Sequence, residues 1–216
     1  MSAILPNGSI FEIATAYSAP KAFTAITNAK PPEVTSAAHG FDDGDVLVVT
    51  SGWTRLNDKV VRMIGSDTDS FGLDGIDTTK TSVYTAGSGL GSVRAASAWA
   101  QISQITDNNS SGGEQQFATF GFLEESDDRQ LPTTKNPITL TLTVADDDSL
   151  PYVAAVEAAD DDREPRVLRL TLPNGATIYY NAYVSITPTP TLTRNNVMAR
   201  VITLSLASRP TRYKAA

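Results

Sequence analysis

Apolar side chains alternate with polar ones most clearly between residues 166 and 210. Leu168, Leu170 and Leu172 fall on one face of the first segment, which is the period-two signature of a half-buried strand. The Pro-Asn-Gly sequence at 173–175 then predicts a tight turn, because Pro fixes φ and Asn-Gly accepts the positive φ values of a hairpin. The pattern predicts the start of an antiparallel meander.

Two further strands complete this predicted meander. The apolar register of the second strand is Ile178, Tyr180, Ala182, Val184 and Ile186. Its outward face carries Tyr179 and Tyr183, which are either ordinary sheet surface or an interface between subunits, where Tyr is enriched. Two prolines in residues 187–191 cannot donate to a ladder and predict an edge or a loop. The third strand, 197–206, is apolar on both faces except at Arg200, which predicts cover on both sides or by a neighbouring subunit.

The most regular alternation upstream predicts a strand over residues 138–144, with Ile, Leu and Val on one face and Thr on the other. Asp146 to Asp148 follow this strand, and carboxylates near a helix start accept from free N–H groups and favour the positive end of the dipole. With Pro151 in the first turn, these residues predict the one α-helix of the chain at about 149–159. Residues 107–113 predict a turn or an exposed loop.

Between residues 31 and 93, Gly or Asp closes nearly every short apolar run, which is typical of a small antiparallel sheet. The runs are 46–50, 60–64, 71–73 and 82–85. With His39-Gly-Phe41, Gly44-Asp45-Val46 and Phe71-Gly-Leu73, the segment resembles a small β module that recurs in phage tail and other virion proteins. This resemblance would make it an insertion between the strands predicted over 10–16 and 98–105. We therefore predict a mainly β fold: an antiparallel β-sandwich or half-barrel core with one helix, plus a small inserted all-β module. The predicted division is a discontinuous core of residues 1–30 and 94–210, a module of residues 31–93 and a C-terminal tail of residues 211–216.

Composition and charge exclude several classes of function. The 24 acidic and 17 basic residues give a net charge of −7, which argues against unassisted affinity for nucleic acid. The sequence has no Cys, so disulfides, zinc–thiolate sites and thiol nucleophiles are excluded. No signal pattern begins the sequence and no apolar run approaches the ~20 residues that cross a bilayer, so we expect no membrane partner and assembly in the cytoplasm.

Candidate chemistry is sparse, and we expect no catalytic, cofactor or metal site. The lone His39 precedes a Gly and fits a turn better than a metal cluster, and no Gly-x-Ser-x-Gly elbow accompanies it. The Asp runs at 146–148 and 160–162 lack the ligand spacing of a calcium loop. The glycines at 87–91 lack the Lys of a phosphate loop. A hydrolase that uses two paired acids ranks far below the other hypotheses, because nothing singles out a pair.

The ordered set of these segments resembles the major tail tube proteins of lambda-like long-tailed phages (siphoviruses). It comprises Trp99 to Ile105, an acidic loop at Glu124 to Asp128, the strand and helix after Ile138, and the meander that ends in Ala207-Ser208-Arg209-Pro210. The resemblance implies hexameric rings of this subunit, stacked into a tube whose lumen passes double-stranded DNA without specific binding. It also implies tail tip, tape measure and tail terminator proteins as partners, and a place in the virion tail.

The acidic loop has two readings. By itself it is a solvated hairpin tip; by the resemblance it reaches an adjacent ring, and its charged residues become candidates for contacts between rings. Those candidates are Glu124, Glu125, Asp127, Asp128 and Arg129, with Tyr179 and Tyr183 as candidates for contacts between subunits. The alternative function is a phage adhesion or virion decoration module, in which residues 31–93 bind a host or virion surface. For the tube, we expect that module on the outer wall.

Overall fold

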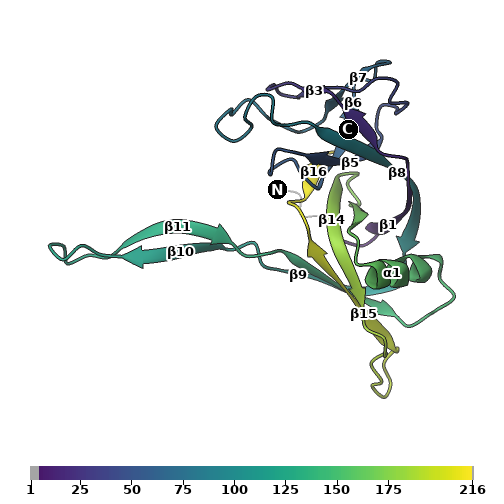
Figure 1. The fold of residues 1–216 in the computed structure, drawn as a ribbon. Helices are drawn as coiled ribbons and strands as arrows, with labels where there is room; N and C mark the ends of the chain where they lie inside the picture. Colours follow the sequence, from purple (N-terminus) through teal and green to yellow (C-terminus); the bar gives the residue numbers. More distant parts are fainter. Residues whose placement is uncertain (1–4, 216) are drawn as a thin grey trace.

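The computed structural model describes residues 5–215, which form a mainly β protein with one α-helix, as predicted (Figure 1). The strands of the core are β1 (Ile10–Tyr17), β8 (Gly91–Ile102), β9 (Ile105–Ser111), β12 (Thr139–Ala145), β13 (Arg166–Thr171), β14 (Thr177–Ile186), β15 (Ala199–Leu206) and the short β16 (Thr211–Tyr213). The strands of the module are β2 (Lys21–Phe23), β3 (Ala25–Ile26), β4 (Glu33–Thr35), β5 (Val46–Ser51), β6 (Lys59–Ile64) and β7 (Ser70–Leu73). A separate hairpin consists of β10 (Gln115–Phe120) and β11 (Arg129–Lys135), and the helix is α1 (Pro151–Asp162).

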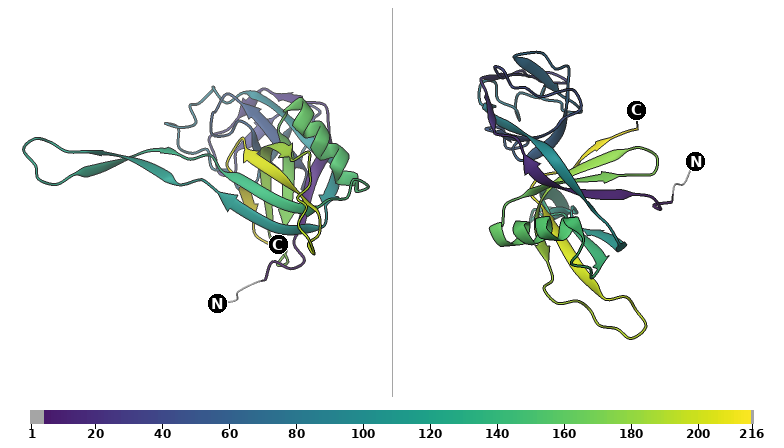
Figure 2. Two further views of the ribbon diagram at one scale, coloured as in Figure 1. Left: turned by 90° about the horizontal axis from the view of Figure 1, so that it is seen from below. Right: turned by 90° about the vertical axis from the view of Figure 1, so that its right-hand side faces the viewer.

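All but the hairpin strands belong to one antiparallel sheet of 14 strands. Its order is β3-β4-β7-β6-β5-β8-β1-β13-β14-β15-β12-β9, and β16 and β2 pair with β14 and β8 off this path. The sheet curls around the core, so that β1 and β8 lie across from β15 and β12, but it does not close into a barrel in residues 5–215 (Figures 1 and 2). The end of the path leaves one edge of β9 without a strand partner among these residues.

The main core lies between the curled sheet and α1. Phe11, Ile13 and Leu142 are buried there with Tyr152 and Val156 of the helix. Pro151 stands in the first turn, where its missing N–H costs nothing, as predicted. The predicted capping is wrong: Leu150 is the N-cap residue and no side chain caps the helix. The three aspartates before it are engaged elsewhere, with a buried arginine and in a tight turn.

The module has its own apolar cluster, which includes Phe23, Leu47, Met63, Phe71 and Ala95. Strand β8 joins the two cores, because its first part pairs with β5 and β2 whereas its second part pairs with β1. The two parts of the chain therefore share a continuous backbone ladder and form one sheet.

Residues 21–26, placed in the predicted core, form β2 and β3 of the module, and three segments differ in secondary structure from the prediction. Residues 107–113, predicted as a loop, lie largely in β9, and residues 82–85, predicted as a strand, form a turn. Residues 211–213, placed in a C-terminal tail, form β16. Backbone pairing explains β9, because ladder hydrogen bonds to β12 need no apolar side chain and every residue after Ile105 in this strand is exposed.

Candidate functional site

Four adjacent strands, β9, β12, β15 and β14, present a face that is rich in hydroxyl groups. Residues paired directly across an antiparallel ladder share a face, so the register fixes its membership. Thr139, Thr141 and Thr143 of β12 pair with Ser205, Thr203 and Val201 of β15 and with Ser111, Asn109 and Asp107 of β9. Tyr183 and Ser185 of β14 pair with Ser205 and Thr203. We call these eleven residues the hydroxyl face.

The hydroxyl face carries hardly any charge. Asp107 is its single ionisable carboxylate, and the eleven paired positions include no Lys or Arg. The alternate residues of the same strands, such as Leu140, Leu142, Ile202 and Leu204, point into the main core and are buried. Strands β12, β14 and β15 are therefore amphipathic, with an apolar side in the main core and a polar, almost uncharged side facing away, whereas β9 is polar on both sides.

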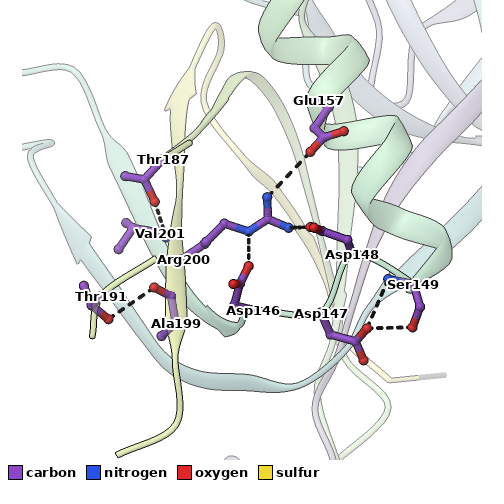
Figure 3. A network of polar contacts seen from close by, with 10 residues as sticks. All are labelled: Asp146, Asp147, Asp148, Ser149, Glu157, Thr187, Thr191, Ala199, Arg200 and Val201. Carbon is purple, nitrogen blue, oxygen red and sulfur yellow. Dashed lines mark hydrogen bonds and ion pairs between the residues drawn. The ribbon is translucent and has the colours of Figure 1, made fainter. Parts of the chain in front are cut away.

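Arg200 occupies a core-facing position of β15 and is held by carboxylates from two segments (Figure 3). Its Nε lies 2.8 Å from Asp146 Oδ1, and a terminal nitrogen lies 2.5 Å from Asp148 Oδ1. The other terminal nitrogen is 3.6 Å from Glu157 Oε1 on α1. These contacts tie the segment after β12, the helix and β15 together beneath the hydroxyl face. The arginine that looked like the exception in an apolar strand is thus ion-paired with carboxylates of its own subunit.

Asp147, between the two aspartates that hold Arg200, closes the turn that leads into α1. Its Oδ1 accepts from the hydroxyl and the backbone N–H of Ser149, at 2.6 and 3.0 Å. These hydrogen bonds, the hydroxyl one foremost, hold the pKa of the Asp147 carboxyl below its usual value. The acidic run is therefore a set of structural contacts, with two residues pairing a cation and one shaping the backbone.

The β10–β11 hairpin projects far from the body as a two-stranded ribbon (Figures 1 and 2). It extends the β9–β12 strand pair, because β9 leads into β10 and β11 leads into β12. Its tip gathers the five charged candidates between residues 124 and 129, all exposed. Arg129 pairs with the Glu125 carboxylate, and its guanidinium lies 5.5 Å from the centre of the Phe122 ring. Their predicted role in contacts between rings stays a prediction.

Large apolar side chains on the hairpin are exposed to solvent, which sequence reasoning did not assign to a surface. Leu123 at the tip is fully exposed, and Phe117, Phe122 and Leu131 are each about half exposed, at 55, 49 and 56%. Such a cluster on a protruding ribbon is typical of a segment that packs against another protein. Phe117, Phe120 and Phe122, upstream of the acidic loop, are the sequence feature from which this apolar surface could have been predicted.

The two predicted tyrosines have different surroundings. Tyr183 is 49% exposed on the hydroxyl face, where it stays a candidate for contact with another subunit. Tyr179 is 5% exposed, and its ring packs against Tyr213 at a centroid distance of 5.7 Å. Its expected place on an open surface is wrong, because the module and β16 cover this end of β14.

Tyr213 joins the core to the module. Its hydroxyl accepts from the Arg62 N–H and donates to the Asp74 carbonyl, both at 2.9 Å. Burial raises its pKa to about 12, against an ordinary value of 10.0. Nearby, the Asp58 carbonyl accepts from the side chains of Asn181 and Ser208. These contacts hold the module in a defined position against the core.

His39 is a structural residue of the module, as its sequence context suggested. It is buried, its Nε2–H donates to the Asp67 carbonyl at 2.6 Å, and its Nδ1 accepts from the Phe41 N–H at 3.1 Å. Within residues 5–215 no group of three or more His, Cys, Asp or Glu is arranged to hold a metal ion. In the same residues, no helix is long and apolar enough to cross a membrane.

Comparisons with known proteins place these features in context. A family model described as phage tail tube protein, TTP, matches residues 51–215. No curated protein matches the chain. Among solved structures, the tube-terminating cap of the anti-feeding prophage is similar at 21% identity and a TM-score of 0.39, covering 53% of this chain and 83% of that chain. The sheath–tube complex of an extracellular contractile injection system, PVC, in its extended state is similar at 18% identity and a TM-score of 0.37, covering 50% and 80%.

Proposed function

This chain belongs to the phage tail tube protein family, and we propose that its hydroxyl face lines the channel of a tube built from stacked hexameric rings. Membership makes the subunit a structural component of a virion tail that assembles with itself and with tail cap or tip proteins. The observation that carries the proposal is a sheet face of four adjacent strands that is polar, almost uncharged and free of cations.

Electrostatics suits this face to the passage of double-stranded DNA. Phosphates are retained mainly by Lys and Arg, since each ion pair releases counterions. Thr, Ser and Asn side chains hold a water layer but form no ion pair with phosphate, and Asp107 adds weak repulsion. The net charge of −7 repels DNA at longer range. A genome therefore slides along this wall without being held.

The edges and the hairpin provide the contacts of assembly. The outer edge of β9 presents unpaired backbone groups that a strand of the next subunit in the ring can satisfy, which would extend the sheet around the channel. The hairpin reaches beyond the body, and its charged tip sets the register between rings. A tape measure protein inside the channel and a tail terminator at the end are the further partners. Assembly takes place in the host cytoplasm.

The module belongs on the outer wall of the tube. It is a folded unit that covers one end of β14 and leaves Tyr183 and the rest of the hydroxyl face open. A unit of that size inside the channel would block a duplex. In this position the module is free to meet the medium around the virion.

Thiol accessibility tests which face lines the channel. The chain has no Cys, so Ser205→Cys places one thiol on the hydroxyl face and Thr68→Cys places one on the module surface, both at exposed positions. In assembled tubes, a small maleimide should label both variants, whereas a maleimide on a large polyethylene glycol should label only the Thr68→Cys variant. In dilute subunits both reagents should label both. Rapid modification of Ser205→Cys tubes by the large reagent along their whole length would refute the assignment.

A further inference from the structure

An open groove lies at the root of the hairpin, where it joins the body. Its volume is about 690 Å³. Thr134 lines it together with the apolar residues Pro137, Ile138, Leu206 and Pro210. Its floor is apolar, and its two charged lining residues are Lys135 and Arg209, so the groove is basic. The Glu114 carboxylate accepts from the Asn136 side chain at 3.3 Å but is not part of the lining.

Further positive charge lies behind the groove. Burial lowers the pKa of the Lys59 amine in the module, and repulsion from the nearby Arg209 guanidinium lowers it further. The side chain of Ser208, between groove and module, donates to the Asp58 carbonyl and fixes the wall. The groove is thus a preformed site with an excess of positive charge in a subunit whose net charge is −7.

The tip of the hairpin has the complementary chemistry. Residues 124–129 include four carboxylates and one arginine, and that arginine already pairs with Glu125. Directly before them, Phe122 and Leu123 expose their apolar side chains, Leu123 completely. We propose that the hairpin tip of one subunit docks in the basic groove at the hairpin root of a second copy, with Leu123 on the apolar floor and the carboxylates beside Lys135 and Arg209.

The occupant must come from another copy. Tip and root are opposite ends of one extended ribbon, which puts them on the order of 25 Å apart for about eight strand residues. A tip-to-root contact joins two different surfaces and is therefore heterologous. Each added copy still has a free surface for the next contact, so the contact can repeat along a stack. This is the geometry that stacked rings require. The inference rests on the proposed tube, and it names the surface that receives the hairpin.

Disulfide trapping in the Cys-free chain tests the contact. We would mix Leu123→Cys subunits with Thr134→Cys subunits, let tubes grow, and oxidise mildly. Thr134 lines the groove and is exposed, whereas its neighbour Thr133 in β11 is also exposed but does not line the groove. We expect mixed disulfide dimers with Thr134→Cys, and loss of most of that yield with Thr133→Cys as the matched control. Each chain carries one thiol, so any mixed dimer is intermolecular.

Charge reversal provides the second arm. Lys135→Glu with Arg209→Glu should abolish sedimentable tubes, while Lys80→Glu, a single reversal at an exposed module lysine, should leave them unchanged. Adding Glu124→Lys and Asp128→Lys to the groove variant should restore tube formation. Unfolding curves of the dilute variants check that each one folds.

The outcomes distinguish failure of the proposed tube from failure of the proposed docking contact. If the wild-type chain forms no tubes, even with tail tip protein as initiator, the proposed function fails and the docking falls with it. If wild-type tubes form but the disulfide yields at 133 and 134 are equal, or the groove variant assembles normally, the docking alone is overturned.

Discussion

Arg200 provides a direct test of what holds the sheet of the proposed channel wall together. Its side chain is 8% exposed, and its three partners are exposed to different degrees: 20% for Asp146, 53% for Glu157 and 79% for Asp148. Arg200→Met keeps most of the apolar stem and removes the charge. Asp148 and Glu157 can then turn into solvent, but Asp146 is left as a mostly buried carboxylate without its cation.

The expected cost follows from this difference in exposure. Removing one partner of a buried pair typically costs about 3–5 kcal/mol, whereas an exposed pair is worth about 0–1 kcal/mol. Since one of the three carboxylates is largely buried, we expect Arg200→Met to lower the free energy of unfolding by about 3 kcal/mol. For a chain of this length, that corresponds to a fall in Tm of about 6–12 °C.

A double-mutant cycle, measured by urea unfolding, separates the contribution of Asp146 to this loss of stability from that of Asp148. Asp146→Asn and Asp148→Asn are each measured alone and combined with Arg200→Met in the dilute subunit. The coupling between Arg200 and Asp146 should be the larger, although the contact with Asp148 is shorter. A coupling to Asp148 equal to or above that to Asp146, or a total cost under about 1 kcal/mol, would contradict the role of burial in this reasoning.

Two further predictions concern the seam and the hairpin. Burial raises the pKa of the Tyr213 hydroxyl to about 12, so as pH rises the unfolded chain loses this proton before the folded chain does. The free energy of unfolding should therefore fall between pH 10 and pH 12. In urea titrations, Tyr213→Phe should make that fall shallower, and an unchanged slope would refute this role. Gly112 has φ of +86°, and a Cβ there would lie 1.8 Å from the Pro137 carbonyl oxygen, so Gly112→Ala should misdirect the hairpin and prevent tube formation in sedimentation assays while unfolding by urea changes little. Gly87→Ala is the control, with φ of +79° and no described atom within 4 Å of its Cβ; equal assembly by both variants would contradict the prediction.

Residues whose neighbours lie along the same or the next strand could be predicted from the sequence. Leu140, Leu142 and Val144 alternate with Thr and are buried as expected, because period-two burial is a local property. The Pro-Asn-Gly turn places Gly175 at φ of +79°, as its turn chemistry requires. The same alternation already placed the Thr side chains on one face, although the sequence could not show that this face extends across four strands.

Contacts between distant segments could not be predicted. Tyr179 is covered by Tyr213 and the module, and no local pattern indicates that a segment more than a hundred residues earlier lies over it. Arg200 looked anomalous because its carboxylates come from other elements. Strand β9 was missed because its side chains are polar and exposed, so only backbone pairing with β12 makes it a strand.

The continuity of β9 with β10 and of β11 with β12 has a mechanical consequence. The hairpin is the far end of the same pair of strands that forms the proposed channel wall, so a load applied at its tip runs through backbone hydrogen bonds into the sheet. Between the two parts stand Gly112 and Gly113, both at positive φ, where the ribbon changes direction. In the proposed tube, bending would turn each hairpin about this glycine pair, so that the angle between rings changes while the sheet of each subunit keeps its shape.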